Sequence, residues 1–463
     1  MNTITRILSG VIAAVLLQNP ALHATNFTWD GGEPLTGDWS AANNWAANIA
    51  PTNNGSADLF FAGTAGFNPN ANLDWSIRSL AFSSGAGGFT IQGNKLTIGT
   101  GGIANNDDSV QTIENDIVLA ASQVFKTSST GSFAINGSIN TAGHTLTVDA
   151  ATDFIVLGGA ITGSGALTAS GANSLVLTGG ESNTYTGVTT VNGSLTLAKT
   201  GGAIAIPGAL IIGGGAGVPH VGIGFDEQIA KGSAVTINAG GSLGLGSGVL
   251  ESVGALTIGG GAVQIGTGTL KTGGVAMTGG SISSALTGRL ILGGNVTASA
   301  GSLISGRIDL GGAARTFIVD GAAGSVLEIP AAISNGSIIK TGAGTLRLSG
   351  TQTYSSLLAQ AGTVDLETAV GTGSASVTVA PLTGTATINF NESQRLASLT
   401  IGNGGVVNVN SDVSSYDSES APPLFQNNGA LTETRGVPEP GALSLLLLGA
   451  CGFLLRRRVT PRA

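Results

Sequence analysis

The chain has 463 residues, of which 76 are glycine, more than double the usual share of roughly 7 %. Hydrophobic residues make up 42 % and charged residues only 10 %, so the composition is not that of a disordered protein, and glycine follows no collagen-like period. Between the two ends, 13 basic residues face 26 acidic ones, which excludes a surface that would hold a phosphate backbone. Many short strands joined by glycine corners fit this composition.

The first 24 residues are typical of a secretory signal peptide. Arg6 supplies a positive start, residues 7–17 are apolar, and small residues at Ala21 and Ala24 form a cleavage site. We expect cleavage after Ala24, which makes the mature protein an exported one. No cysteine would remain in the exported part before Cys451, so disulfides and thiolate metal sites are not expected.

Residues 25–75 are predicted to form an N-terminal cap. All four tryptophans lie here, at Trp29, Trp39, Trp45 and Trp75. The end of a stacked sheet needs a cover because its open edge would pair with other strands. Aromatic rings also stack on sugars, so these tryptophans have a second interpretation as a carbohydrate surface.

Residues 76–410 are predicted to be a repeat array. Short runs of alternating apolar residues recur between glycine-rich corners, as at 96–98, 146–148, 175–177, 235–237, 256–258 and 346–348. Alternation places one side chain in a core and the next in solvent. No single turn of three short strands can bury its apolar side, whereas stacked turns share one continuous core. Turns of ~22 residues would give a rod of roughly 17 turns.

Two segments of this array align without gaps, 184–195 and 353–364. In both, an apolar residue follows the tyrosine (Tyr185 or Tyr354) by three positions and another follows it by ten. The segments resemble the autotransporter-associated β-strand repeat, most clearly at 175–197 and 342–366. Ser356 and Gln360 depart from that pattern, and the first copy has two extra residues before its tyrosine. The resemblance implies a right-handed parallel β-helix, an all-β solenoid. Because the two tyrosines occupy equivalent positions of the repeat, we expect each to pack against neighbouring turns.

The C-terminal region has a polar linker at 411–436 and then three parts in a fixed order. Val437, Pro438, Glu439 and Pro440 precede an uncharged stretch at 441–455, and Arg456, Arg457 and Arg458 follow it. As a helix the stretch would measure about 22 Å, and the arginines would hold its end in the cytoplasm. Residues 437–458 resemble a PEP-CTERM sorting signal. That resemblance implies a single transmembrane helix and processing by an exosortase, a membrane protease-transpeptidase.

Motifs for cofactors are missing from the sequence, and we expect neither a cofactor nor a metal. No glycine-rich dinucleotide or phosphate loop and no calcium nonapeptide occurs. Residues 240–244 match the nucleophile elbow around Ser242, but that motif requires a strand-to-helix turn and a later histidine. His144 and His220 both precede Ser242, so glycine abundance explains the match.

Carboxylate groups are the remaining catalytic candidates, because β-helix lyases and hydrolases use clusters of them. The densest groups are Asp107-Asp108, Asp226-Glu227 and Asp365-Leu366-Glu367. In the last group, alternation predicts Leu366 inside and both acids on one outer face, where a glycosidase pair needs about 5 to 10 Å between carboxyls. Most such pairs are solvated surface charge, and we expect no catalytic residue.

Together these features predict a non-enzymatic protein of the cell surface or extracellular matrix of a Gram-negative-type bacterium. Before it reaches that location, the exported protein would be an intermediate anchored in the inner membrane. Its expected partners are an exosortase-type enzyme, the membrane before processing, and exopolysaccharide or other matrix components. Nucleic acid is not among them. The alternatives are a surface polysaccharide-degrading enzyme and an autotransporter-like passenger, although a passenger needs a C-terminal membrane barrel.

Overall fold

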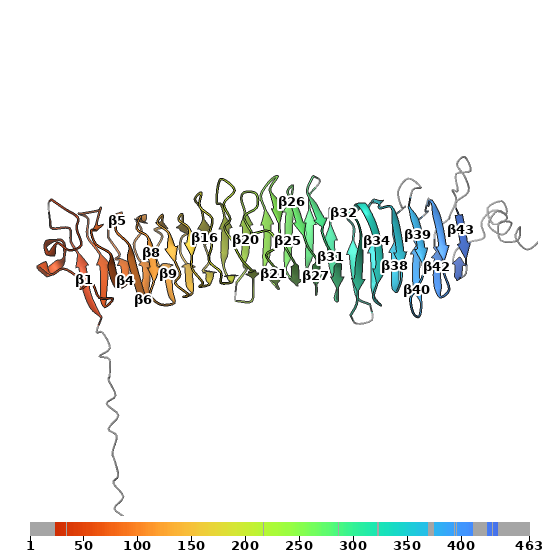
Figure 1. The fold of residues 1–463 in the computed structure, drawn as a ribbon, viewed down its shortest axis with the longest axis horizontal. Coiled ribbons are helices and arrows are strands. Elements are labelled where there is room, and N and C mark those ends of the chain that lie inside the picture. Colours follow the sequence, from red (N-terminus) through yellow and green to blue (C-terminus); the bar gives the residue numbers. More distant parts are fainter. Residues whose placement is uncertain are drawn as a thin grey trace, which may run out of the picture.

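The computed structural model describes residues 24–433, apart from 34, 216, 286, 322–323, 369–374, 393, 395, 411–423 and 428. These residues form an all-β parallel solenoid of about 16 turns. The turns stack side by side into one elongated rod with the N-terminal strands at one end and the last strands at the other (Figure 1). The prediction of a stacked parallel β-helix is therefore confirmed at the level of the solenoid.

Each turn visits three faces in the same order. The first face consists of β8 (Ile117–Leu119), β11 (Ile139–Asn140), β14 (Ile161–Thr162), β23 (Leu250–Ser252), β26 (Thr269–Thr272), β29 (Arg289–Leu292) and β36 (Gln352–Thr353). The second face consists of β1 (Thr25–Trp29), β2 (Ala57–Phe61), β9 (Gln123–Thr127), β12 (Leu146–Ala150), β15 (Leu167–Ser170), β17 (Thr189–Val191), β19 (Leu210–Ile212), β21 (Val235–Asn238), β24 (Leu256–Gly259), β27 (Val275–Met277), β30 (Val296–Ala298), β37 (Ser356–Ala359), β39 (Ser376–Val379), β41 (Ser398–Ile401) and β43 (Leu424–Asn427).

Four longer strands continue around the corner between these two faces and join them into one 26-stranded sheet: β4 (Trp75–Phe82), β6 (Leu96–Asn105), β32 (Arg307–Val319) and β34 (Ala332–Thr341). The third face is a separate sheet of β3 (Asn70–Ala71), β5 (Thr90–Gly93), β7 (Gln111–Ile113), β10 (Phe133–Ile135), β13 (Ile155–Leu157), β16 (Ser174–Leu177), β18 (Ser194–Leu197), β20 (His220–Ile223), β22 (Ser242–Leu245), β25 (Ala262–Gly266), β28 (Ser281–Ser284), β31 (Ser302–Ser305), β33 (Val326–Ile329), β35 (Thr345–Leu348), β38 (Gly362–Leu366), β40 (Ala386–Phe390), β42 (Gly405–Val409) and β44 (Ala430–Glu433).

Alternation along each strand builds the core. All six runs named from the sequence are strands, and the first and last residues of each run point inward. Each strand pairs in parallel with an equivalent strand of a neighbouring turn, so side chains stack in columns, as in the buried third-face column of Leu175, Leu195, Val221, Leu243 and Val263. One apolar core consequently runs from Phe27 to Val407.

Glycine corners let the turns differ in length. Val275 lies 19 residues after its partner Leu256, whereas Val235 lies 25 residues after Leu210. At Gly171 the backbone has φ +92°, and an added Cβ would lie 2.5 Å from the carbonyl oxygen of Ala150. Such a corner admits only glycine, because both the conformation and the space exclude a side chain.

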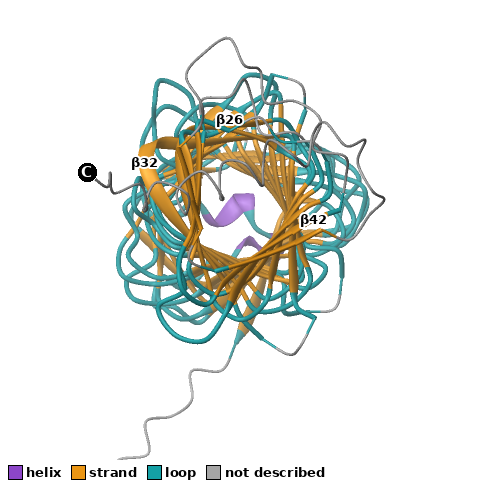
Figure 2. Ribbon diagram, turned by 90° about the vertical axis from the view of Figure 1, so that its right-hand side faces the viewer, coloured by secondary structure: helices purple, strands orange, loops and turns teal. Residues whose placement is uncertain are grey.

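The N-terminal end of the rod is closed by an aromatic cluster. Two short 3-10 helices, η1 (Ala42–Asn44) and η2 (Ala46–Asn48), lie across this end of the ring of strands (Figure 2). The rings of Trp29 and Trp45 meet edge to face at 5.1 Å, and the Trp45 indole N–H donates to the Trp39 carbonyl at 2.8 Å. Trp75 joins them and all four indoles are buried. The alternative interpretation of these rings as a sugar-stacking surface is wrong, because no face of them is open to a ligand.

The two tyrosines predicted to pack between turns are both buried, which confirms that prediction. The gapless alignment around them is wrong by one residue in the middle, however. Val188 is 40 % exposed, while Leu357, its aligned partner, is buried. Thr189 takes the inward position in the first copy. The register is regained by a longer corner in the second copy, so that Leu195 and Val364 are again equivalent interior residues of the third face.

Candidate functional site

The first carboxylate pair, Asp107 and Asp108, serves the turn that contains it. Asp107 is buried and accepts a hydrogen bond from the backbone N–H of Ser109 at 2.8 Å. Asp108 accepts hydrogen bonds from the hydroxyls of Ser129 and Thr130, which lower the pKa of its carboxyl. Asp107 therefore stabilises its own turn, and Asp108 connects that turn to the next one.

The second pair, Asp226 and Glu227, is also fixed to the following turn. Asp226 accepts the backbone N–H of Leu250 at 2.8 Å. Glu227 accepts the Ser252 hydroxyl at 3.0 Å and forms an ion pair with Lys231 at 3.5 Å. The hydrogen bonds from Leu250 and Ser252 connect two turns, whereas the ion pair with Lys231 lies within one turn. The two carboxylates are not paired with each other.

The third group lies on the outer face of β38, with Leu366 inside, as alternation predicted. Arg347 spans both acids, at 3.3 Å from Asp365 and 3.7 Å from Glu367. Two columns of asparagines extend each acid along the rod: Asn389 and Asn408 follow Asp365, and Asn391 and Asn410 follow Glu367. One guanidinium thus compensates half of the charge of the two acids, within an amide ladder that stabilises parallel strands.

Ser242 and His220 lie closer together than chain order indicated. They occupy neighbouring strands β22 and β20, and the imidazole Nδ1 is 2.9 Å from the Ser242 hydroxyl. The ring lies over Gly222 and Gly244, where an added Cβ would meet it at 3.5 and 3.2 Å. The useful signal was their separation of 22 residues, about one turn, rather than their order along the chain.

The Ser242–His220 pair does not have the surroundings of a nucleophile elbow. Ser242 is the first residue of the strand β22, whereas the elbow places its serine at a sharp turn from a strand into a helix. Within the described part of the chain, no carboxylate contacts the imidazole to orient it. A serine and histidine alone can hold a proton between them, but the third group of a catalytic triad is not in place.

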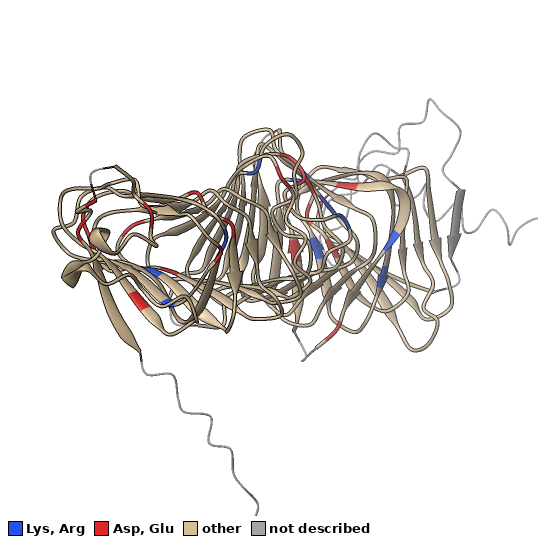
Figure 3. Cartoon of the chain, turned by 60° about the vertical axis from the view of Figure 1, so that its left-hand side comes forward, with Lys and Arg blue, Asp and Glu red and all other residues tan. Residues whose placement is uncertain are grey.

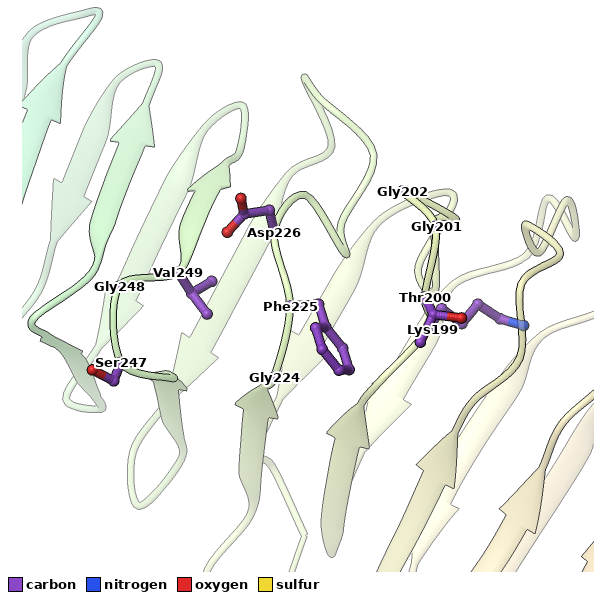
Figure 4. Close-up of a pocket in the computed structure, with 10 residues that line it drawn as sticks. All are labelled: Lys199, Thr200, Gly201, Gly202, Gly224, Phe225, Asp226, Ser247, Gly248 and Val249. Atoms are coloured by element: carbon purple, nitrogen blue, oxygen red, sulfur yellow. The ribbon is translucent and has the colours of Figure 1, made fainter.

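An open groove of about 560 Å³ lies between the corners that follow β18, β20 and β22. Its lining includes the half-exposed ring of Phe225, together with Asp226 and Val249, and glycines form much of the remaining wall (Figure 4). Lys199 borders this groove, yet its side chain extends away from it (Figure 4). The Lys199 ammonium instead donates to the carbonyls of Thr178 and Gly159, at 2.8 and 3.3 Å.

A buried polar network lies beneath this groove. The Gln228 side chain accepts the backbone N–H of Lys199 at 2.9 Å and donates to the Lys199 carbonyl at 3.1 Å. Glu251 accepts the backbone N–H of Gln228 at 2.8 Å and that of Ile229 at 3.2 Å. Burial lowers the pKa of Lys199 to about 8 and raises the pKa of Glu251 to about 7. Both side chains satisfy backbone groups, so their shifted pKa values reflect a structural role.

A second buried lysine follows the same principle farther along the rod. The Lys340 ammonium donates to the carbonyls of Thr341, Gly342 and Ala361 at 2.7 to 3.1 Å, and burial lowers its pKa to about 8. Neither lysine could be recognised from the sequence, because each stands in an ordinary alternating run. Among the described residues, no three His, Cys, Asp or Glu side chains are grouped so that they could hold a metal ion.

The sorting residues lie outside the described residues, namely Val437, Pro438, Glu439, Pro440, Arg456, Arg457 and Arg458. Ala24 is described, is exposed, and directly precedes β1. In the part of the chain that the structure covers, no helix has the length and apolar character needed to cross a membrane. Comparisons with protein-family models, curated proteins and solved structures found no match to this chain. The fold defines its class, which is that of parallel β-solenoid proteins.

Proposed function

We propose that this protein is an exported, non-enzymatic rod of the bacterial cell surface or extracellular matrix, processed by an exosortase through a PEP-CTERM signal. The observation that carries the proposal is the tripartite segment at 437–458, which follows the rod and a polar linker. In this proposal the solenoid is right-handed, as in the proteins whose repeats it resembles. A long rigid body joined to a processing signal fits a matrix component.

The chemistry of the segment supports its role as a signal. Proline cannot continue a helix, so Pro438 and Pro440 would end the membrane segment in an extended conformation that a protease can reach. The three arginines prevent the C-terminal end of the chain from crossing the membrane, because transferring each guanidinium into the hydrocarbon core costs several kcal/mol. Glu439 would then be the charge nearest the outer surface, available to a basic pocket of the processing enzyme.

The test is mass spectrometry of the mature C-terminus in wild-type and exosortase-deleted cells. We expect the wild-type protein to end near Pro440 and the protein of the deleted strain to end at Ala463. Replacing Pro438, Glu439 and Pro440 with alanine should leave the full-length protein in the inner membrane. A matched control replaces the same residue types in the linker, Glu419, Pro422 and Pro423, and should be processed normally. Full-length protein in both strains would overturn the proposal.

The non-enzymatic part of the proposal has its own test. The three candidate carboxylate groups are engaged by backbone N–H groups, hydroxyls, amides or Arg347, and Ser242 is engaged by His220. We expect the purified protein to release no sugar from polysaccharides, with or without calcium. Activity lost in a Ser242→Ala or an Asp365→Asn variant would overturn this part and favour the polysaccharide-degrading alternative.

A further inference from the structure

The outer side of the second face carries a column of threonines. Parallel pairing from β9 to β32 places ten outward residues in one line, and six of them are threonine: Val124, Thr147, Thr168, Thr190, Ile211, Thr236, Thr257, Ala276, Thr297 and Ile318. Neighbouring members are about 4.8 Å apart, the spacing of paired strands. The result is a straight row of hydroxyl and methyl groups about 43 Å long.

The residues on either side keep this strip flat. On one side the backbone pairing aligns small residues, Ala166, Val188, Ala209, Ala234, Ala255 and Gly274. On the other side it aligns Ser170, Asn192, Gly213, Asn238, Gly259, Thr278 and Ser299. None of these side chains is charged, although charges occur elsewhere on the same turns; Figure 3 shows how sparse they are along the rod. We call these three columns, from residue 166 to residue 299, the threonine strip.

Five threonine hydroxyls of the strip's central column are free to bind a ligand. Thr168, Thr190, Thr236, Thr257 and Thr297 are half-buried or exposed, and their hydroxyls make no hydrogen bond within the described part of the chain. Each hydroxyl can donate one hydrogen bond and accept others. A ligand of the strip must therefore offer both donors and acceptors, together with apolar C–H groups for the methyls.

The lack of charge and the small area of the threonine strip disfavour two kinds of partner, charged polymers and a second copy of this chain. A polyanion would find no cation on the threonine strip, so charged polymers are disfavoured. A second copy of this chain would bury only on the order of 400 Å² per partner, given the ~29 Å length and ~13 Å width of the strip between residues 166 and 299. Stable homodimers bury about 800 Å² per partner or more and rely on aromatic or arginine anchors, which the strip does not contain.

We propose that the threonine strip binds an ordered neutral polysaccharide, whose surface presents equatorial hydroxyls and C–H groups on a flat, rigid lattice. The strip is the outward side of paired strands, which matches a flat ligand surface, so the expected ligand is a packed lattice of chains. This inference rests on the proposed matrix function and names the partner of the rod. It depends on the second face alone and not on the C-terminal signal.

The experiment measures retention of the purified full-length protein on microcrystalline cellulose, chitin and particulate β-1,3-glucan. We expect retention on at least one of these solids, and a fall of about tenfold or more for the double variant Thr236→Lys and Thr257→Lys. A second variant, Thr236→Val and Thr257→Val, keeps the shape and removes the hydroxyls, and should also weaken retention. The matched control is Thr363→Lys with Thr387→Lys, two paired outward threonines of the third face, which should bind normally.

Three results would overturn the proposal. One is failure to bind any of the neutral solids, and another is equal retention of the strip and control variants. The third is concentration-dependent dimerisation that the Thr236 and Thr257 variants abolish, which would assign the strip to a second copy. Mass spectrometry of the C-terminus is independent of this assay, so failure of the strip and failure of the sorting proposal are distinguishable.

Discussion

At the scale of single residues, the two repeat tyrosines show how similar positions can differ in energy. The Tyr185 hydroxyl lies 2.5 Å from the Thr189 hydroxyl, whereas the Tyr354 hydroxyl is buried and has no hydrogen-bond partner among the described residues. The one-residue shift in register explains the difference, because Leu357 occupies the inward position that Thr189 fills in the first copy. Burial raises the pKa of both phenols, so neither ionises in the physiological range.

We therefore predict opposite results for the same substitution at the two sites. Tyr185→Phe leaves the buried Thr189 hydroxyl without its partner and should lower the free energy of unfolding by about 1–2 kcal/mol. Tyr354→Phe removes an unsatisfied hydroxyl and should be neutral or stabilising by up to about 1 kcal/mol. Urea denaturation of the two variants checks this. Equal losses at both sites would contradict the hydrogen bonding described.

Glu251 predicts a pH dependence of stability. Burial raises the pKa of its carboxyl from 4.5 to about 7 in the folded chain, so the folded state holds the proton more tightly than the unfolded state. The resulting stabilisation is complete below pH 4.5 and is lost as the pH rises through 7. A shift of this size corresponds to about 3 kcal/mol.

The measurement compares denaturation of wild type and Glu251→Gln between pH 5 and pH 8. We expect the stability of wild type to fall relative to the variant over this range. Glu328→Gln, at an exposed position of β33, is the control and should follow wild type. Parallel pH profiles for Glu251→Gln and wild type would show that the carboxyl titrates normally.

At the scale of elements, alternation was sufficient to predict which runs are strands and which side chains face inward. It works because each strand of a solenoid has one dry side and one wet side. Alternation did not predict which face a strand belongs to, since all three faces share the same pattern. The corners decide this, and their lengths vary from turn to turn.

The same limit applies to the candidate sites. The Ser242–His220 contact and the Arg347 bridge to Asp365 both join residues about one turn apart, and only the register brings them together. The sequence could predict that Asp365 and Glu367 share an outer face, but not that an arginine 18 residues earlier neutralises Asp365. The buried lysines were not predictable, because their partners are backbone carbonyls, which no sequence motif marks.

At the scale of the whole molecule, the solenoid is a stack in which each turn contacts its neighbours. The apolar core joins turns through equivalent residues, and like residues recur in every column. Stability should then depend on the number of turns and on the quality of each junction. The fold as a whole should tolerate loss of a turn provided that the columns still meet in register.

Deletion of residues 275–295 tests this property, because it removes one turn and joins equivalent columns. Leu256 would then pair with Val296, Val263 with Ile304 and Leu270 with Ile308, so every new junction of the core is apolar. We expect a folded rod that is shorter by about 4.8 Å. Deletion of only residues 275–285 removes about half a turn and sets the second face against the first. That variant should lose its cooperative unfolding transition. Circular dichroism and small-angle X-ray scattering measure both outcomes, and loss of structure in the full-turn deletion would show that the turns are not interchangeable units.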